Sequence, residues 1–225
     1  MTNKKLLIFN GSPRKKGTSY SFALTIKKLA EEVGNTAEII HIIEYLEEGK
    51  NIEDLRESIV NSQIIAISSP LYVDSLPHPV IWFFEELVNK YKTELKGKSF
   101  FAIGQCAFPY PVLIDTLIGC CRCFAEEAQM KWLGGLNYGG GVLINGELVE
   151  NLGKKGVKIT SAFKHALKEI YEGKEMSSMS QKMLSKEIPR LLVRPMALLL
   201  NHMAKTNGKK NGFTVADIER KAYLE

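Results

Sequence analysis

The feature that most constrains the fold of this chain is the alternation of short apolar runs with longer segments of helical period. Five apolar runs are typical of strands: Lys5–Phe9, Ala37–Ile43, Ser62–Ser68, Ser99–Gly104 and Trp132–Val142. Helical period marks five further segments: Ser19–Val33, Ile52–Val60, Pro79–Tyr91, Tyr110–Gln129 and Lys154–Tyr171. Strands that are apolar along most of their length are buried on both faces, and strict strand–helix alternation requires right-handed crossovers. The pattern therefore predicts a three-layer α/β sandwich in which helices cover both faces of a five-stranded parallel sheet.

Charge divides the chain into two parts. Residues 1–173 hold 20 Lys and Arg and 20 Asp and Glu, whereas residues 174–225 hold 10 and 5. We therefore expect a main domain over residues 1–173 and a basic helical extension over residues 174–225. Because the main domain has no basic excess, nucleic acid is not an expected partner. The N-terminal apolar run is too short for a signal peptide, so a cytoplasmic location is expected.

The four cysteines do not have the pattern of a disulfide framework or a metal site. Cys106 stands alone, and Cys120, Cys121 and Cys123 crowd into "GCCRC" on a predicted helix. The CxxC spacing of Cys120 and Cys123 is also ordinary helical i, i+3 spacing, and no fourth cysteine is near. We therefore interpret these cysteines as small apolar residues and expect no bound metal.

The loop after the first strand has the residues of an anion site. In "FNGSPRKKGTSYSF", Ser12, Thr18 and Ser19 offer hydroxyl groups and Arg14 a guanidinium, and a helix begins at about Thr18. The unpaired N–H groups and the positive dipole end of that helix would face the same point. A Walker A loop would need Gly at Lys16, and a dinucleotide fingerprint would need Gly at Pro13, so the spacing favours a mononucleotide phosphate. The alternative is that Thr18 or Ser19 only caps the helix, and the loop alone leaves both interpretations open.

Two further loops follow strands whose ends the fold brings together. In "SSPLYVDSLPHPV", residues 68–80, Tyr72 could lie against a planar ring, with the backbone of Leu71–Val73 at the polar edge of the ring. In "GQCAFPYP", residues 104–111, Gly104 allows close backbone approach and Gln105 offers an amide. Each loop could equally be an ordinary strand-to-helix connection.

Together the three loops give the chain a resemblance to a known family. Over about residues 4–173, and most specifically in "NGSPRKKGTS" and "SSPLYVDSLPHPVIWFFEEL", the chain resembles flavodoxin-like NAD(P)H-dependent FMN reductases. The resemblance implies FMN as the cofactor and the flavodoxin strand order 2-1-3-4-5. The residues that it assigns to FMN are Ser12, Arg14, Thr18 and Ser19 at the phosphate, Pro70, Leu71, Tyr72 and Val73 beside the isoalloxazine, and Gly104 and Gln105 at the other edge. Asp74 departs from the family, which often has Gly there, and a carboxylate aimed at the ring would disfavour an anionic reduced flavin.

The resemblance also implies an activity. NADPH or NADH would pass hydride to FMN, and a small acceptor such as a quinone, a nitro or azo compound or free flavin would then take the electrons. No catalytic side chain is expected, because the flavin carries the chemistry. A homodimer is expected, since related reductases complete the pocket across an interface. Two alternatives stay open: a flavodoxin-type carrier that docks redox proteins, and a flavin-free binding module on the same scaffold.

The basic extension contains a second helical pattern. Apolar residues at helical spacing are flanked by cations: Leu191, Leu192, Pro195, Leu198, Leu199 and Met203 lie among Arg190, Arg194, Lys205, Lys209 and Lys210. We expect a helix that packs on the main domain or on a second subunit. A membrane-surface helix is the alternative, because apolar face and cations coincide. Pro195 and the short length of the segment argue against a membrane partner.

Overall fold

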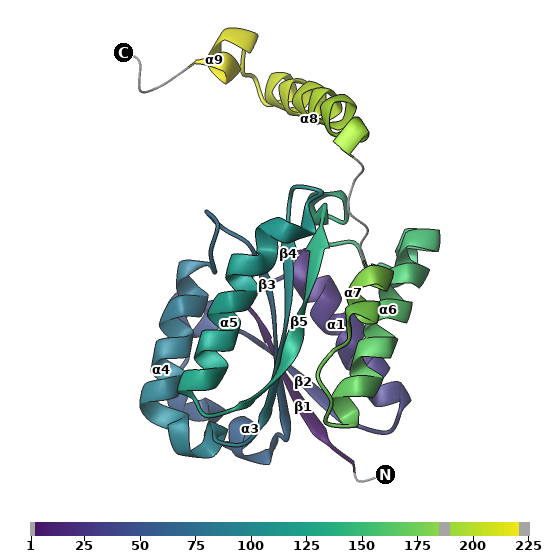
Figure 1. Ribbon diagram of the computed structural model, residues 1–225. Helices are drawn as coiled ribbons and strands as arrows, with labels where there is room; N and C mark the ends of the chain where they lie inside the picture. The colour runs from purple at the N-terminus through teal and green to yellow at the C-terminus, as the bar shows by residue number, and fades with distance from the viewer. Residues whose placement is uncertain (1–2, 185–189, 221–225) are drawn as a thin grey trace. The chain divides into compact units, whose positions relative to one another are not determined.

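A computed structural model describes residues 3–184 and 190–220 of the chain (Figure 1). Its sheet has five parallel strands: β1 (Lys5–Asn10), β2 (Thr36–His41), β3 (Ile64–Pro70), β4 (Ser99–Cys106) and β5 (Lys131–Gly139). The strand order is β2-β1-β3-β4-β5, which confirms the predicted flavodoxin-like architecture.

Helices cover both faces of this sheet (Figure 1). One face carries α3 (Arg56–Asn61), α4 (His78–Leu95) and α5 (Asp115–Glu127). The other carries α1 (Thr18–Glu32), α6 (Gly153–Tyr171) and α7 (Ser178–Leu184). Short helical turns connect these elements: α2 (Ile43–Leu46), η1 (Ile52–Leu55), η2 (Pro111–Ile114), η3 (Gly141–Leu143) and η4 (Val149–Leu152).

The apolar strands explain the two-sided core. Successive side chains of a strand point to opposite faces, so Leu7 and Phe9 of β1 enter the layer of α4 and α5, whereas Leu6 and Ile8 enter the layer of α1 and α6. The central strand β3 is buried at every position. All seven of its residues therefore need apolar or paired neighbours on both faces, which is what the continuous run in the sequence indicated.

Strand β5 ends earlier than predicted. The apolar run suggested a strand as far as Val142, but the strand stops at Gly139. Gly140 has a φ of 80°, in the left-handed region that favours glycine, and its N–H donates a hydrogen bond to the carbonyl of Phe108 at 2.7 Å. Residues 140–148 therefore form a loop at the carboxyl edge of the sheet, which the sequence analysis had assigned in part to a strand.

The cysteines of the "GCCRC" segment lie on α5. Cys121 is buried among apolar side chains, and this burial raises the pKa of its thiol well above the ordinary range. Cys123 is exposed, Cys120 is half-buried, and all four cysteines of the chain are free thiols. Within the described residues no group of three His, Cys, Asp or Glu side chains is arranged to hold a metal ion.

The chain forms two compact units, residues 1–186 and residues 187–225. Helix α7 belongs to the first unit, where the Gln181 amide donates to the carbonyl of Asn137 on β5 at 2.8 Å. The second unit contains α8 (Arg190–Lys210) and α9 (Val215–Glu219). The extension expected from the sequence, residues 174–225, thus divides between the two units; its residues 185–189 and 221–225 and the Arg190 side chain lie outside the described part of the structure.

Helices α8 and α9 are joined by polar contacts. Lys205 of α8 forms an ion pair with Glu219 of α9. Thr214 and Asp217 form a capping box that begins α9. None of the helices described here combines the length and the apolar content that a membrane crossing requires.

Candidate functional site

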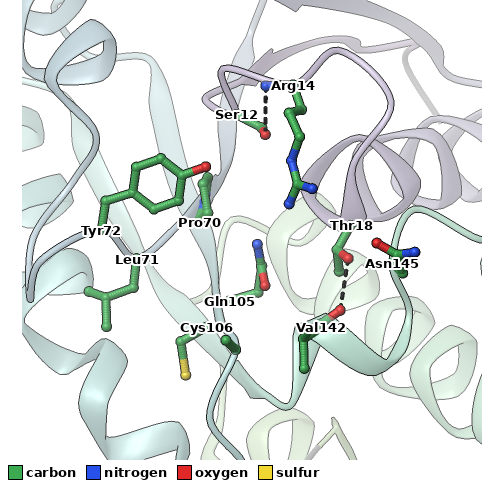
Figure 2. A pocket seen from close by; sticks show the side chains of 12 residues that line it. Ser12, Arg14, Thr18, Pro70, Leu71, Tyr72, Gln105, Cys106, Val142 and Asn145 are labelled. Atoms are coloured by element: carbon green, nitrogen blue, oxygen red, sulfur yellow. Dashed lines mark hydrogen bonds between the residues drawn. The ribbon is translucent and has the colours of Figure 1, made fainter. Parts of the chain in front are cut away.

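A cavity of about 160 Å³ lies at the carboxyl edge of the sheet, where the loops after β1, β3, β4 and β5 meet (Figure 2). Most of the residues predicted from the sequence line it: Ser12, Arg14, Thr18, Pro70, Leu71, Tyr72 and Gln105. Three residues that were also assigned to the cofactor, Ser19, Val73 and Gly104, do not line this cavity. Five further residues line it that were not predicted from the sequence: Cys106, Ala107, Gly141, Val142 and Asn145.

Hydrogen bonds from the end of β1 and from within the loop itself hold the loop after β1 in its conformation. The buried side chain of Asn10 accepts a hydrogen bond from the N–H of Ser12 at 3.3 Å and contacts His41 of β2 at 2.9 Å. The Ser12 hydroxyl then accepts from the N–H of Arg14 at 3.2 Å (Figure 2). These bonds turn the chain just beyond the strand, so the loop is fixed by its own polar groups before α1 begins.

The first turn of α1 has no side-chain cap. Gly17 is the N-cap residue, no side chain accepts from the turn, and the turn contains no acidic residue. The Thr18 hydroxyl instead donates to the carbonyl of Gly141 at 2.9 Å, and the Ser19 hydroxyl lies 3.4 Å from the Gln105 amide nitrogen. The interpretation of Thr18 or Ser19 as a simple cap is therefore wrong. The leading N–H groups of the helix stay open to an anion, on the side where the dipole favours negative charge.

Two cations of this loop, Arg14 and Lys15, differ in their partners. Lys15 pairs with Glu44 at 2.8 Å and Glu48 at 2.9 Å, and these two carboxylates raise the pKa of its ammonium group. Arg14, in contrast, forms no ion pair with any described residue, and its side chain extends into the cavity on the same side as Thr18 (Figure 2). Arg14 is therefore available to a bound anion, whereas Lys15 already has two.

The loop after β3 supplies the opposite wall. The N–H of Leu71 donates to the carbonyl of Gln105 at 2.7 Å, which fixes the loop to the end of β4. Tyr72 lines the cavity with a side chain that is 42% exposed, and in Figure 2 its ring faces the opening from the side away from Thr18. The ring is thus available for stacking against a planar ligand.

The tip of this loop is a tight turn. Tyr72 and Ser75 exchange two backbone hydrogen bonds, at 2.9 and 3.0 Å, across Val73 and Asp74. Both central residues have positive φ, 47° and 57°, and the Val73 side chain is 99% exposed. A β-branched residue is strained in this region. The turn carries Val73 away from the cavity, and Asp74 is exposed and does not line it.

The loop after β4 places Gln105 in the centre of the cavity (Figure 2). The neighbouring Gly104 contacts side chains of the α5 layer. A Cβ there would lie 2.2 Å from Cγ2 of Ile114 and 3.1 Å from Cδ2 of Leu117. Glycine is needed at this position because α5 and the turn before it pack against the strand. Burial raises the pKa of the Cys106 thiol, which donates to the Phe108 carbonyl at 3.1 Å.

The loop after β5 closes the cavity beside α1. Its Gly141 lies so close to Gln105 that a Cβ would be 1.9 Å from the amide oxygen. Gly146 has a φ of 82°, and a Cβ there would lie 2.6 Å from the carbonyl of Lys16. The Ser21 hydroxyl donates to the Glu147 carbonyl at 2.6 Å. The signal for this loop was the glycine run 139–141 followed by Asn145–Gly146, which is turn chemistry rather than strand chemistry.

The geometry agrees with the chemistry of FMN. One end of the cavity offers open helix N–H groups and an unpaired guanidinium, which suit a phosphate monoester. The other end offers Tyr72, Leu71 and Pro70, which suit an apolar planar ring. A volume of about 160 Å³ is smaller than the roughly 300–1,000 Å³ of typical ligand pockets. Only part of an FMN molecule would therefore be enclosed, and the rest would lie in the open mouth.

Comparison with known protein structures places the fold among flavodoxin-like proteins. The Trp repressor binding protein from Bacillus subtilis matches 72% of this chain and 97% of its own, with 17% identity and a TM-score of 0.52. General stress protein 14 from Treponema denticola, solved in complex with FMN, matches 73% and 99%, with 12% identity and a TM-score of 0.52. A putative quinone reductase from Klebsiella pneumoniae matches 77% and 86%, with 8% identity and a TM-score of 0.55. At these identities the likeness establishes the fold alone.

The family comparison is more specific. Residues 4–108 match the family model described as NADPH-dependent FMN reductase. No curated protein matches the sequence significantly. The matched range contains the loops after β1 and β3 and the first residues after β4, so it covers every cavity residue that the sequence predicted. The resemblance is confirmed over this range, and with it FMN as the cofactor and NAD(P)H as the co-substrate of an oxidoreductase. Residues 4–108, a little under half of the chain, are therefore similar to the NADPH-dependent FMN reductase family.

Proposed function

We propose that this protein passes reducing equivalents from NADPH or NADH, by way of bound FMN, to a small organic acceptor. Quinones, nitro and azo compounds and free flavins are the acceptor classes. The observation that carries the proposal is the cavity itself. It joins an uncapped helix N-terminus and the unpaired Arg14 to the half-exposed ring of Tyr72 within one space.

The phosphate of FMN would bind at the start of α1. Ser12 and Thr18 are buried there, and the Thr18 hydroxyl is engaged with Gly141, so the backbone N–H groups of the first turn are the principal donors. Arg14 adds a charge-assisted contact of the kind that is roughly twice as strong as a neutral hydrogen bond. Ser19 is buried and turned toward Gln105, so its part in the site is to hold the Gln105 amide rather than to reach the ligand.

The ring system would lie on the side of Pro70, Leu71 and Tyr72. FMN bound there would supply hydride transfer, since the protein has only to bind, orient and polarise it. Tyr72 offers a ring for stacking, and Gln105 offers an amide in the middle of the cavity (Figure 2). The Gly104 backbone faces α5 and contributes packing. This arrangement needs no side chain that acts as an acid or base.

An open mouth suits a two-substrate cycle. The reduced nicotinamide and the acceptor use the same exposed face in turn, so that face must stay accessible to molecules of different shape. The exposed ring of Tyr72 at the cavity offers an apolar surface to planar organic molecules. The quinone reductase among the structural relatives is consistent with such an acceptor, although it is the fold alone that the two proteins share.

Two further expectations belong to this proposal. A homodimer is supported by the family resemblance, because related reductases complete the substrate side of the pocket with a second subunit. A cytoplasmic location is supported by the four free cysteines. Sedimentation equilibrium of the FMN-loaded protein would test the first, and fractionation of the native host would test the second.

Steady-state kinetics tests the proposed function. The FMN-loaded protein is mixed with NADPH or NADH and with a panel of quinone, nitro, azo and flavin acceptors. We expect oxidation of the nicotinamide that depends on the acceptor. A flavoprotein that neither nicotinamide reduces would support the electron-carrier alternative, and a correctly folded protein that takes up no FMN would support a flavin-free module.

A further inference from the structure

Helix α8 is the one helix of the described chain in which exposed leucines coincide with a pure excess of cations. Its 21 residues include five Lys and Arg and no Asp or Glu. It belongs to the second unit, residues 187–225, and lies outside the range matched to the reductase family. The cofactor site accordingly gives no account of why this helix has the composition that it has.

The apolar residues of α8 form a continuous stripe. Leu192, Met196, Leu199 and Met203 follow one another at intervals of four, three and four residues, which places them on one side of a helix. Leu192 is 49% exposed, Leu199 58% and Met203 42%, so α9 of the same unit does not cover them. Leu191 and Leu198 extend the stripe along one border and are 87% and 71% exposed.

Three of the five cations of α8 have no ion-pair partner among the described residues. Lys205 has Glu219 of α9 as its partner. Arg194, Lys209 and Lys210 form no ion pair with any residue that the structure describes. Since α8 itself contains no carboxylate, two copies of the helix placed side by side would bring like charges together. The charge therefore favours an anionic partner over a second copy of the helix.

An anionic partner that also accepts leucine and methionine side chains is a lipid surface. Nucleic acid complements the cations but leaves the apolar stripe in water, whereas the boundary between lipid headgroups and acyl chains accommodates both. We propose that α8 binds an anionic lipid surface, lying flat with the stripe of Leu192, Met196, Leu199 and Met203 in the membrane interface. This inference is independent of the proposed reductase activity.

The structure removes both reasons that the sequence gave against a membrane partner. Pro195 does not end the helix, which runs from Arg190 to Lys210 without a break. With a rise of about 1.5 Å per residue, the 21 residues extend for roughly 30 Å, which is ample for a helix that lies in the plane of a membrane. Pro195 removes the hydrogen bond that its N–H would donate one turn back, and the helix continues through it.

Vesicle co-sedimentation of the full-length protein tests the proposal. One set of vesicles contains phosphatidylcholine alone, and the other contains phosphatidylcholine mixed with phosphatidylserine. We expect binding to the mixed vesicles that weakens as salt is raised, because surface electrostatics is screened within about 10 Å at 0.1 M salt. Absence of binding to the mixed vesicles, or equal binding to both sets, would overturn the proposal.

Three variants separate the contributions to binding. Leu192→Ser with Leu199→Ser should weaken binding roughly tenfold or more, through loss of buried apolar area. Lys209→Gln with Lys210→Gln should weaken it by roughly 25-fold, at about fivefold per cation. Asn201→Ser, on the polar side of the helix, is the matched control and should bind like the parent protein.

Two measurements keep these outcomes interpretable. Circular dichroism and FMN affinity should be the same in all the variants, because the first unit is unchanged; this separates failure of the proposal from failure of the reductase assignment. Size-exclusion chromatography reports self-association. If the leucine pair changes the oligomeric state and leaves lipid binding unaltered, the stripe belongs to a subunit interface and the proposal is wrong.

Discussion

The two sides of the candidate cofactor cavity are built in opposite ways. On the α1 side, Ser12 and Thr18 are buried and are tied by hydrogen bonds to Arg14 and to Gly141. On the β3 side, the turn beyond Tyr72 is exposed, and Val73 and Asp74 adopt the left-handed region with no glycine to relieve the strain. One wall is therefore fixed by buried polar bonds, and the other is an exposed loop under strain.

This difference corresponds to two requirements of a flavin reductase. The cofactor phosphate is the same in every catalytic cycle, so a binding site for it that is already ordered raises affinity without restricting the reaction. The ring side must admit a nicotinamide and then an acceptor of different shape, so a fixed wall there would restrict the reaction. We infer that the α1 side determines cofactor affinity and that the Tyr72–Ser75 turn influences substrate access, and the following predictions test that division.

The largest effect is expected at Arg14. Replacement by alanine removes a charged donor that has no other described partner, and hydrogen bonds to charged groups contribute about 2 kcal/mol. Arg14→Ala should therefore raise the Kd for FMN roughly 30-fold. The measurement is fluorescence titration of the apoprotein with FMN.

The neighbouring Lys15 is the matched control for this change. It is a cation of the same loop, but Glu44 and Glu48 already neutralise it. Lys15→Ala should change FMN affinity by less than about threefold, as is usual for exposed ion pairs. Equal losses in the two variants would show that the loop acts by general charge rather than through Arg14.

The next effect concerns the bond between α1 and the loop after β5. Thr18→Val keeps the side-chain volume but leaves the Gly141 carbonyl without its donor, and a buried group left unpaired costs about 1–3 kcal/mol. We expect the free energy of unfolding to fall by about 1–2 kcal/mol in urea titrations. Thr25→Val is the control, because the Thr25 hydroxyl bonds only to Ser21 within its own helix. An unchanged free energy of unfolding in Thr18→Val would contradict the view that buried polar bonds hold the α1 side of the cavity rigid.

The strained turn should respond in the opposite direction. Asparagine tolerates the left-handed region better than valine, so Val73→Asn should increase the free energy of unfolding by about 0.5–1 kcal/mol. Val142→Asn is the control, since Val142 is exposed at the same cavity but has no positive φ. If the substitution at Val73 lowers stability, the turn is not strained as described.

The smallest expected effect is a pH dependence of stability at Glu44, which pairs with Lys15 of the loop after β1. Hydrogen bonds from Lys15 and then Lys50 lower the pKa of Glu44 from 4.5 to about 2. Because the pKa is lower in the folded protein, the stabilisation is complete above about pH 4.5 and is lost as the pH falls toward 2. Both lysines are exposed by 40% or more, which limits the contribution to about 1 kcal/mol or less.

Glu44→Gln should therefore flatten the stability profile between pH 4.5 and 2, measured by thermal unfolding across that range. Glu48→Gln serves as the comparison, because Glu48 is half exposed and contacts Lys15 alone among the lysines here. A steeper profile in Glu44→Gln than in the parent protein would contradict the assignment.

Sequence periodicity was enough to predict the five strands, their parallel arrangement and the three loops of the site. Burial of a parallel strand on both faces leaves a continuous apolar run, and a helix on each face leaves a period that can be counted. The loop after β5 was not predicted, because the apolar Val142 extended the apparent strand across Gly140. The positive φ of Gly140 is not visible in a hydrophobic pattern.

Individual roles within the loops could not be read from residue type. A glycine that admits a ligand and one that admits a helix look the same in a sequence, and Gly104 faces Ile114 and Leu117. Val73 follows Tyr72 directly, yet the tight turn sends it into solvent. Ser19 follows the loop after β1 directly, but its hydroxyl lies against the Gln105 amide. Packing on a helix decides the role of Gly104, a local turn decides the direction of Val73, and a contact with Gln105 decides that of Ser19.

Anaerobic titration of the FMN-loaded protein with NADPH tests the central claim most directly. The account predicts that the visible absorption of the bound flavin is bleached by about one equivalent of NADPH and returns when a quinone is added. If the flavin binds but stays oxidised in excess NADPH and in excess NADH, the protein is not a nicotinamide-dependent reductase, and this account of the cavity is wrong.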